Sequence, residues 1–210
     1  MQFTPHDLVW IDTLDALHLT EVMPEWVKQT YRHNLPVVIR RDQNREGLIA
    51  AGIRGTLRSQ RQACWIETKH IIKRVRPQDL IHEQYWQRYN WQHLPVVHSL
   101  MQLAKLNWPL PWGVTGSCGY SLATGSIAMR AQSDLDLQVL APTRPHADDF
   151  KLILKATKNL PVRVDIQLET PAGGVALNDW LQHSEQVLVK SNTGPYLSSN
   201  PWSAAQPEVL

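Results

Sequence analysis

Residues 133–140 are Ser133-Asp134-Leu135-Asp136-Leu137-Gln138-Val139-Leu140, in which polar and aliphatic side chains alternate strictly from Asp134 onward. This alternation predicts a β-strand with Asp134, Asp136 and Gln138 on one face and the aliphatic residues packed on the other. Two carboxylates on one face of a strand have Cα atoms about 7 Å apart. That spacing suits two Mg²⁺ ions about 3.5–4 Å apart. The segment therefore predicts a metal-dependent phosphoryl or nucleotidyl transfer site.

Gly116-Ser117 is a candidate phosphate cradle, because it lies between an expected strand at 112–115 and an expected helix at 118–124. A Gly-Ser turn alone would not identify such a site. Backbone N–H groups at the start of a helix bind phosphate oxygens. A second pair, Gly125-Ser126, offers an alternative cradle. We favour Gly116-Ser117, because a strand precedes it, whereas Gly125 suits a helix C-terminus.

Cys118 follows Ser117 and is a candidate nucleophile. We favour a structural role for this residue, as a small side chain at the start of a helix, because no base is identifiable beside it in the sequence.

A third carboxylate lies on an expected strand at 162–168, where Asp165 shares a face with Arg163 and Gln167. If this strand lies beside the strand of Asp134 and Asp136, three acids converge. Two of them would hold metal, and Asp165 would take a proton from an attacking hydroxyl.

The segment 40–76 carries ten Lys or Arg residues against three acidic residues, within a chain of net charge +2. It includes Gly52 and Gly55 and the arginines Arg54, Arg58 and Arg61. Guanidinium groups bind phosphates in a bidentate manner, so we expect a compact polyphosphate rather than nucleic acid as the ligand. An exposed basic turn, and a surface for an acidic carrier protein, are the alternatives.

The bulk composition indicates a globular cytoplasmic protein without membrane association. The 210 residues are 43% hydrophobic, which is enough for a real core. No apolar run approaches the length of a membrane span, and no signal peptide is recognisable. Only two cysteines are present, too few for a disulfide framework.

The order of expected elements predicts an α+β protein with two domains, 1–95 and 96–210. The first is a small basic α/β domain, with a helix at 24–31, strands at 37–40, 48–53 and 62–67, and a helical stretch at 77–88. The second is a nucleotidyltransferase-type domain with a mixed sheet. Its elements are a helix at 98–106, a strand at 112–115, a helix at 118–124, a strand at 134–140, a helix at 147–157 and a strand at 162–168. Beyond Ala172 we expect turns at Gly173-Gly174 and at 192–195, and a short helix near 178–180.

The Gly-Ser, Ser-Asp-Leu-Asp-Leu and Val-Asp-Ile-Gln motifs resemble those of the nucleotidyltransferase superfamily of DNA polymerase β type. The spacing between Gly-Ser and the first aspartate is longer here than is common in that superfamily. Longer motifs, found along nearly the whole chain, resemble the phosphoribosyl-dephospho-CoA transferases of the malonate decarboxylase system. They are the segments 6–10, 52–61, 113–120, 167–171 and 200–202.

This resemblance implies transfer from 2′-(5″-triphosphoribosyl)-3′-dephospho-CoA to a serine of the apo acyl carrier subunit of malonate decarboxylase, with release of pyrophosphate. It implies Mg²⁺ on Asp134 and Asp136, Asp165 at the nucleophile, and phosphate binding by Gly116, Ser117 and the three arginines Arg54, Arg58 and Arg61. Three alternatives stay open: the same transfer in the citrate lyase system, a general nucleotidyltransferase using ATP, and a degenerate carrier-binding or nucleotide-binding module.

Overall fold

The structure is a computed structural model that describes residues 2–32, 34–43, 45–57, 59–182 and 185–203. The chain divides into two compact units, Met1–Arg76 and Pro77–Leu210. The sequence analysis placed the boundary at residue 95 instead. The difference arises because residues 77–81 form a short helix that packs on strand β7 of the second unit, where it contacts Gly113.

The first unit is built on a six-stranded sheet with the strand order β2-β5-β4-β3-β1-β6. Each described strand pairing in it is antiparallel, so the unit is not the α/β domain that we expected. Its elements are β1 (Leu8–Ile11), η1 (Leu14–Ala16), β2 (Leu17–His18), α1 (Glu25–Arg32), β3 (Val37–Ile39), β4 (Leu48–Arg54), β5 (Arg61–Glu67), η2 (Thr68–His70) and β6 (Ile71–Val75).

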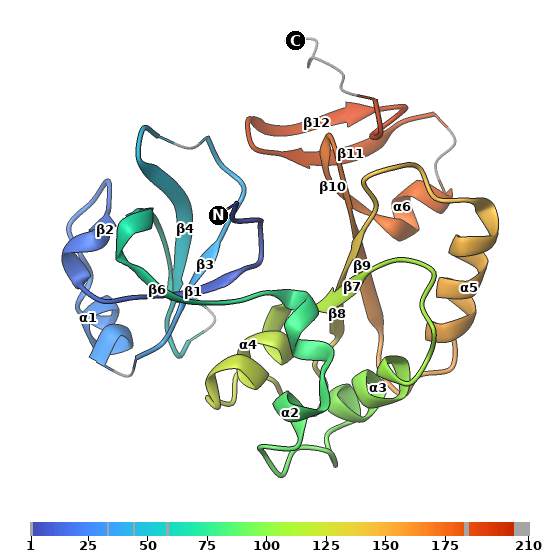
Figure 1. Ribbon diagram of the computed structural model, residues 1–210, viewed down its shortest axis with the longest axis horizontal. Helices are drawn as coiled ribbons and strands as arrows, with labels where there is room; N and C mark the ends of the chain where they lie inside the picture. The colour runs from blue at the N-terminus through green and yellow to red at the C-terminus, as the bar shows by residue number, and fades with distance from the viewer. Residues whose placement is uncertain (1, 33, 44, 58, 183–184, 204–210) are drawn as a thin grey trace. The chain divides into compact units, whose positions relative to one another are not determined.

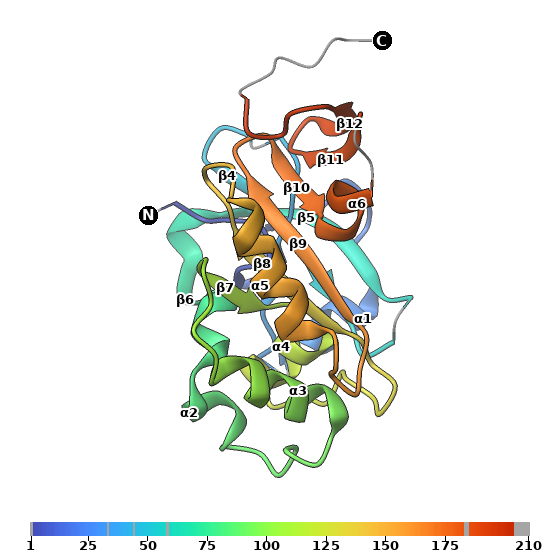
Figure 2. The same cartoon turned by 90° about the vertical axis from the view of Figure 1, so that its right-hand side faces the viewer.

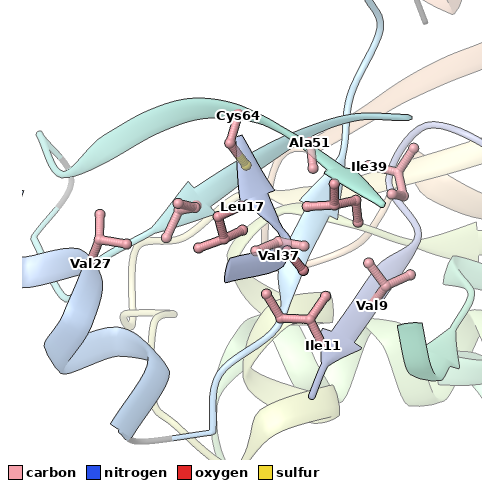
Figure 3. Packing of buried hydrophobic residues seen from close by; sticks show 11 residues of the cluster. Val9, Ile11, Leu17, Val27, Val37, Ile39, Ala51 and Cys64 are labelled. Atoms are coloured by element: carbon pink, nitrogen blue, oxygen red, sulfur yellow. The ribbon is translucent and has the colours of Figure 1, made fainter. Parts of the chain in front are cut away.

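One face of this sheet forms the core of the first unit. Alternate residues of β4, such as Ala51 and Ile53, point to it, and Cys64 and Ile66 of β5 join them. Val27 of α1 packs on the same cluster, which is shown in Figure 3. Because side chains alternate along a strand, Arg54 and Arg61 are placed on the opposite face.

The second unit contains a six-stranded mixed sheet with the order β12-β11-β10-β9-β8-β7. Its elements are η3 (Pro77–Ile81), α2 (Glu83–Trp86), α3 (Pro95–Ala104), β7 (Trp112–Val114), α4 (Gly116–Thr124), β8 (Leu135–Leu140), α5 (Ala147–Thr157), β9 (Val164–Thr170), β10 (Gly173–Ala176), α6 (Leu177–Gln182), β11 (Val187–Ser191) and β12 (Gly194–Ser198). The α+β class and the mixed sheet are thereby confirmed.

The inner strands β8 and β9 form a parallel pair in this sheet. Parallel neighbours need a crossover connection, and α5 supplies it. The helix begins after His146, whose backbone N–H donates to Asp149 at 2.9 Å, and it buries Phe150 and Ile153. Figures 1 and 2 show α5 running along one face of β8 and β9. The other face of the two strands carries the polar residues.

The C-terminal part of the second unit differs in one respect from the expectation. Gly173 and Gly174 belong to strand β10, which pairs with β9, and do not form a separate turn. A backbone hydrogen-bond ladder on both sides of β10 outweighs the low strand propensity of glycine here. The expected short helix is present as α6. Among the described helices, none has the length and apolar character needed to cross a membrane.

Candidate functional site

Asp136 and Asp165 lie side by side on two inner strands of the mixed sheet. They are register partners on the parallel strands β8 and β9, whose backbones are about 4.8 Å apart. Both residues are half-buried, whereas Asp134 is exposed and lies just ahead of β8. The expected adjacency of the two strands is therefore present, and it brings two of the three predicted carboxylates together.

The start of α4 lies directly against Asp136. The Thr115 N–H donates to the backbone carbonyl of Asp136 at 2.9 Å, and Gly116 follows with φ +62°. A Cβ at residue 116 would overlap Oδ2 of Asp136, so only glycine leaves room for this carboxylate. The fold thus places the N-terminal turn of a nine-residue helix beside the carboxylate pair.

The second Gly-Ser pair has a different position. Gly125 is the C-cap of α4, with φ +77°, and its N–H donates to the carbonyl of Ser121 at 2.8 Å. A glycine in this conformation ends a helix. The preference for Gly116-Ser117 as the candidate cradle therefore agrees with the helix boundaries.

Asp165 has a partner to which the sequence analysis gave no role. Nε and Nη2 of Arg163 donate to Oδ1 of Asp165 at 3.0 and 2.9 Å. Both contacts reach the same oxygen, which orients the carboxylate and leaves Oδ2 outside this ion pair. The i, i+2 spacing on one strand face was the signal for this pairing.

The carboxylates do not form a preformed metal cage. In the described part of the chain, no three His, Cys, Asp or Glu side chains are gathered closely enough to hold a metal ion. Mg²⁺ is commonly bound by one or two carboxylates together with substrate phosphates and water. Hard oxygen donors on Asp134 and Asp136, beside a helix N-terminus, are consistent with that mode of binding.

Cys118 is not suited to act as a nucleophile. Its side chain is fully buried, and burial raises the pKa of its thiol to about 12, with a further contribution from the negative charge of Asp136. Thiolate is the reactive form, and it is absent at neutral pH in such a position. The structural role that we favoured for Cys118 is confirmed.

Two of the three predicted arginines lie opposite each other in the first unit. Arg54 and Arg61 are register partners on β4 and β5, joined by a turn that the Gly55 N–H closes with a 3.0 Å bond to the carbonyl of Gln60. Arg54 is half-buried and Arg61 is exposed. Arg58 lies outside the described residues. Like charges that face each other across strands repel, and a bound anion would relieve that repulsion.

A row of polar residues continues from the carboxylate pair along the same face of β8 and β9. Gln138 is only 2% exposed, and its Oε1 accepts a hydrogen bond from Nε2 of Gln78 at 3.1 Å. Its register partner is Gln167, whose Nε2 donates to Oε1 of Glu169 at 2.8 Å. The sequence analysis placed Gln138 and Gln167 on the carboxylate face but assigned them no function, and it did not single out Glu169.

Comparison with known proteins gives matches over nearly the whole chain. Residues 4–77 match the phosphoribosyl-dephospho-CoA transferase MdcG N-terminal domain, and residues 80–201 match the MdcG C-terminal domain. The two family domains meet close to the boundary between the compact units.

Individual relatives support the same grouping. A phosphoribosyl-dephospho-CoA transferase of Klebsiella pneumoniae is 38% identical over 198 residues, which cover 94% of this chain and 95% of the relative. One of Azotobacter vinelandii is 38% identical over 94% of this chain and 93% of its own. One of Pseudomonas aeruginosa is 38% identical over 98% of this chain and 96% of its own. No solved structure matches significantly.

Proposed function

We propose, since the chain belongs to the phosphoribosyl-dephospho-CoA transferase family, that it attaches the prosthetic group of malonate decarboxylase to that enzyme's acyl carrier subunit. The donor is 2′-(5″-triphosphoribosyl)-3′-dephospho-CoA, and the acceptor is a serine of the apo carrier. The observation that carries the proposal is the Asp136–Asp165 register pair beside the start of α4, in a chain matched by both domains of the family. We also propose that it works in the cytoplasm, because both cysteines are free thiols.

In this mechanism, the carrier serine attacks the α-phosphorus of the donor. A bond forms between the serine Oγ and phosphorus, the bond from phosphorus to the bridging oxygen of the β-phosphate breaks, and pyrophosphate leaves. The serine proton passes to Asp165, whose Oδ1 is held by Arg163. A positioned general base typically contributes about 10²–10⁴-fold to the rate.

The triphosphate is held by the remaining groups of the second unit. Asp134 and Asp136 are the proposed ligands of Mg²⁺, which would neutralise charge on the phosphates when it is bound. The exposed Gly116 and half-buried Ser117 would present backbone N–H groups of the first turn of α4 to a phosphate oxygen. These groups would accelerate the reaction if they bind the phosphates more tightly in the transition state, where negative charge develops, than in the ground state.

The arginines of the first unit are proposed to bind anionic groups of the donor or the departing pyrophosphate. The facing positions of Arg54 and Arg61 support this role. Arg58 is included on its sequence position alone. The same residues are compatible with a carrier-binding role for this basic segment, because an acidic protein surface is negatively charged, as the phosphates of the donor are.

The test is a transfer reaction with purified chain, Mg²⁺, triphosphoribosyl-dephospho-CoA and the apo carrier subunit of malonate decarboxylase. Pyrophosphate release and the mass of the carrier are measured together. We expect the carrier to gain the mass of the phosphoribosyl-dephospho-CoA group, and Asp136→Asn to abolish the gain. Parallel reactions use the apo carrier of citrate lyase, and ATP as the donor. Faster modification of the citrate lyase carrier, transfer from ATP alone, or no transfer at all would each contradict the proposal.

A further inference from the structure

The carboxylate face of the mixed sheet extends beyond the catalytic pair as a regular series of polar side chains. Along β9, Asp165, Gln167 and Glu169 occupy alternate positions and therefore share one face. Successive members are about 7 Å apart. The opposite face of the same strand holds Ile166 and Leu168, which are buried. A ligand anchored at Asp165 would therefore extend past Gln167 and Glu169.

The β8 side of this face is already occupied by protein. The Cβ that Gly113 lacks would overlap the backbone of Pro77 and Gln78, so η3 lies directly against β7 at this point. Nε2 of Gln78, in η3, donates a hydrogen bond to Oε1 of Gln138. Gln138 is consequently covered, while Gln167 and Glu169 on the next strand are half-buried and keep access to solvent.

The β10 side presents little side-chain volume. The register partners of Gln167 and Glu169 on β10 are Ala176 and Gly174. Glycine inside a strand weakens it and often marks a place where a ligand or another backbone comes close. Neither partner provides a polar side chain, so any polar ligand on this strip would be recognised mainly from β9.

The chemistry of the two β9 residues is that of a hydroxyl-binding pair. The 2.8 Å bond from Nε2 of Gln167 engages Oε1 of Glu169 and orients its carboxylate. A carboxylate accepts hydrogen bonds from sugar hydroxyls, as the acidic residue of dinucleotide-binding folds does with ribose. The Gln167 carbonyl oxygen adds a second acceptor.

We propose that Gln167 and Glu169 bind ribose hydroxyl groups of the donor, next to the α-phosphate, whose proposed place is beside Asp136 and Asp165. The inference rests on the proposed function, because the phosphate position comes from it. In the donor, one ribose carries the triphosphate and is joined to the ribose of the dephospho-CoA part. A chain of two sugars leading away from the α-phosphorus matches two hydroxyl-binding residues that follow Asp165 along one strand.

The test compares Gln167→Leu and Glu169→Gln with two matched controls, Gln102→Leu on α3 and Glu185→Gln before β11, both at exposed positions. Calorimetry measures the affinity for 3′-dephospho-CoA and for inorganic triphosphate, and steady-state kinetics gives the KM for the donor. 3′-Dephospho-CoA contains only the second of the two riboses. Loss of a hydrogen bond to the charged Glu169 therefore predicts about tenfold weaker binding of 3′-dephospho-CoA, and a KM for the donor about tenfold higher, in Glu169→Gln. Loss of the neutral Gln167 bond predicts a KM for the donor about fivefold higher in Gln167→Leu. Triphosphate affinity, and both controls, should stay within about twofold of wild type.

An unchanged dephospho-CoA affinity in Glu169→Gln, or an unchanged KM for the donor in Gln167→Leu, would overturn the inference. A parallel loss of triphosphate affinity would also overturn it, because the effect would then come from damage to the sheet. Failure of the proposed function has a different signature: the protein would bind 3′-dephospho-CoA in a Glu169-dependent manner yet transfer nothing to the carrier.

Discussion

The backbone of Gly116 lies against the carboxylate of Asp136, at the distance where a Cβ would sit on Oδ2. One residue at the start of α4 thus limits where one carboxylate of β8 can lie. The contact is reinforced by the hydrogen bond from the Thr115 N–H to the Asp136 carbonyl. The first turn of α4 and the acidic strand β8 are therefore one structural unit, and a change to one is expected to displace the other.

Gly116→Ala should abolish most activity while costing little stability. The added methyl group would displace the Asp136 carboxylate, and a displacement of about 1 Å in a catalytic group can lower the rate about 100-fold. The alanine would also occupy left-handed backbone space, at a cost of about 1 kcal/mol. Transfer rate and urea unfolding measure the two effects.

Gly47→Ala is the matched control for this prediction. Gly47 has φ +70° and no atom within 4 Å of its absent Cβ, so the backbone cost is the same and the steric overlap is missing. Equal losses of activity in the two variants would show that strain alone, and not the Asp136 carboxylate, explains the result.

The three carboxylates are expected to differ in importance when each is changed to asparagine. Asp134→Asn and Asp136→Asn should remove transfer and weaken the response to Mg²⁺, because these are the proposed metal ligands. Asp165→Asn should lower kcat by about 10²–10⁴-fold and leave the Mg²⁺ requirement unchanged. Asp148→Asn, at the exposed ion pair with Lys151, is the control. A Mg²⁺ response altered equally by all three changes would assign Asp165 to metal binding.

Both thiols should be unreactive in the native protein. Burial raises the pKa of Cys64 and of Cys118 to about 12, from an ordinary value of 9.0. Ellman's reagent at pH 8 should modify neither residue until urea is added, and Cys118→Ala should retain transfer activity. Loss of activity in that variant with an unchanged unfolding curve would restore Cys118 as a functional candidate.

The same thiols predict the alkaline stability of the protein. Between pH 9 and about 12, the unfolded chain loses these protons while the native state keeps them. The native state then binds more protons, so the free energy of unfolding should fall as pH rises through this range. Replacing both cysteines with alanine should reduce that slope in urea titrations.

Arg61→Ala should weaken anion binding without unfolding the first unit. Arg61 faces Arg54 across β4 and β5, and removal of one like charge relieves repulsion. Pyrophosphate should raise the melting temperature of wild type more than that of the variant, because stabilisation follows affinity. Lys28→Ala, on the exposed face of α1, is the control. An equal shift in wild type and Arg61→Ala would exclude this arginine from the anion site.

Local patterns in the sequence were enough to predict several elements of the second unit. Alternation at 134–140 predicted β8, and the helix expected at 147–157 is α5. Periodicity is a property of residues that are close in sequence, so it can be recognised without knowledge of the tertiary contacts. The strands β1 and β6 were not predicted, and their pairing joins residues sixty or more positions apart.

The sequence by itself determined that Asp136 and Asp165 lie on polar strand faces, that a glycine begins the helix after β7, and that the chain is α+β. Only the tertiary structure decided which of these residues meet. It made Asp136 and Asp165 register partners, kept Asp134 exposed, fixed Gly116 against Asp136 and placed the unit boundary at Arg76/Pro77. The physical reason is that strand register and glycine contacts depend on packing between segments distant in sequence, which local periodicity does not encode.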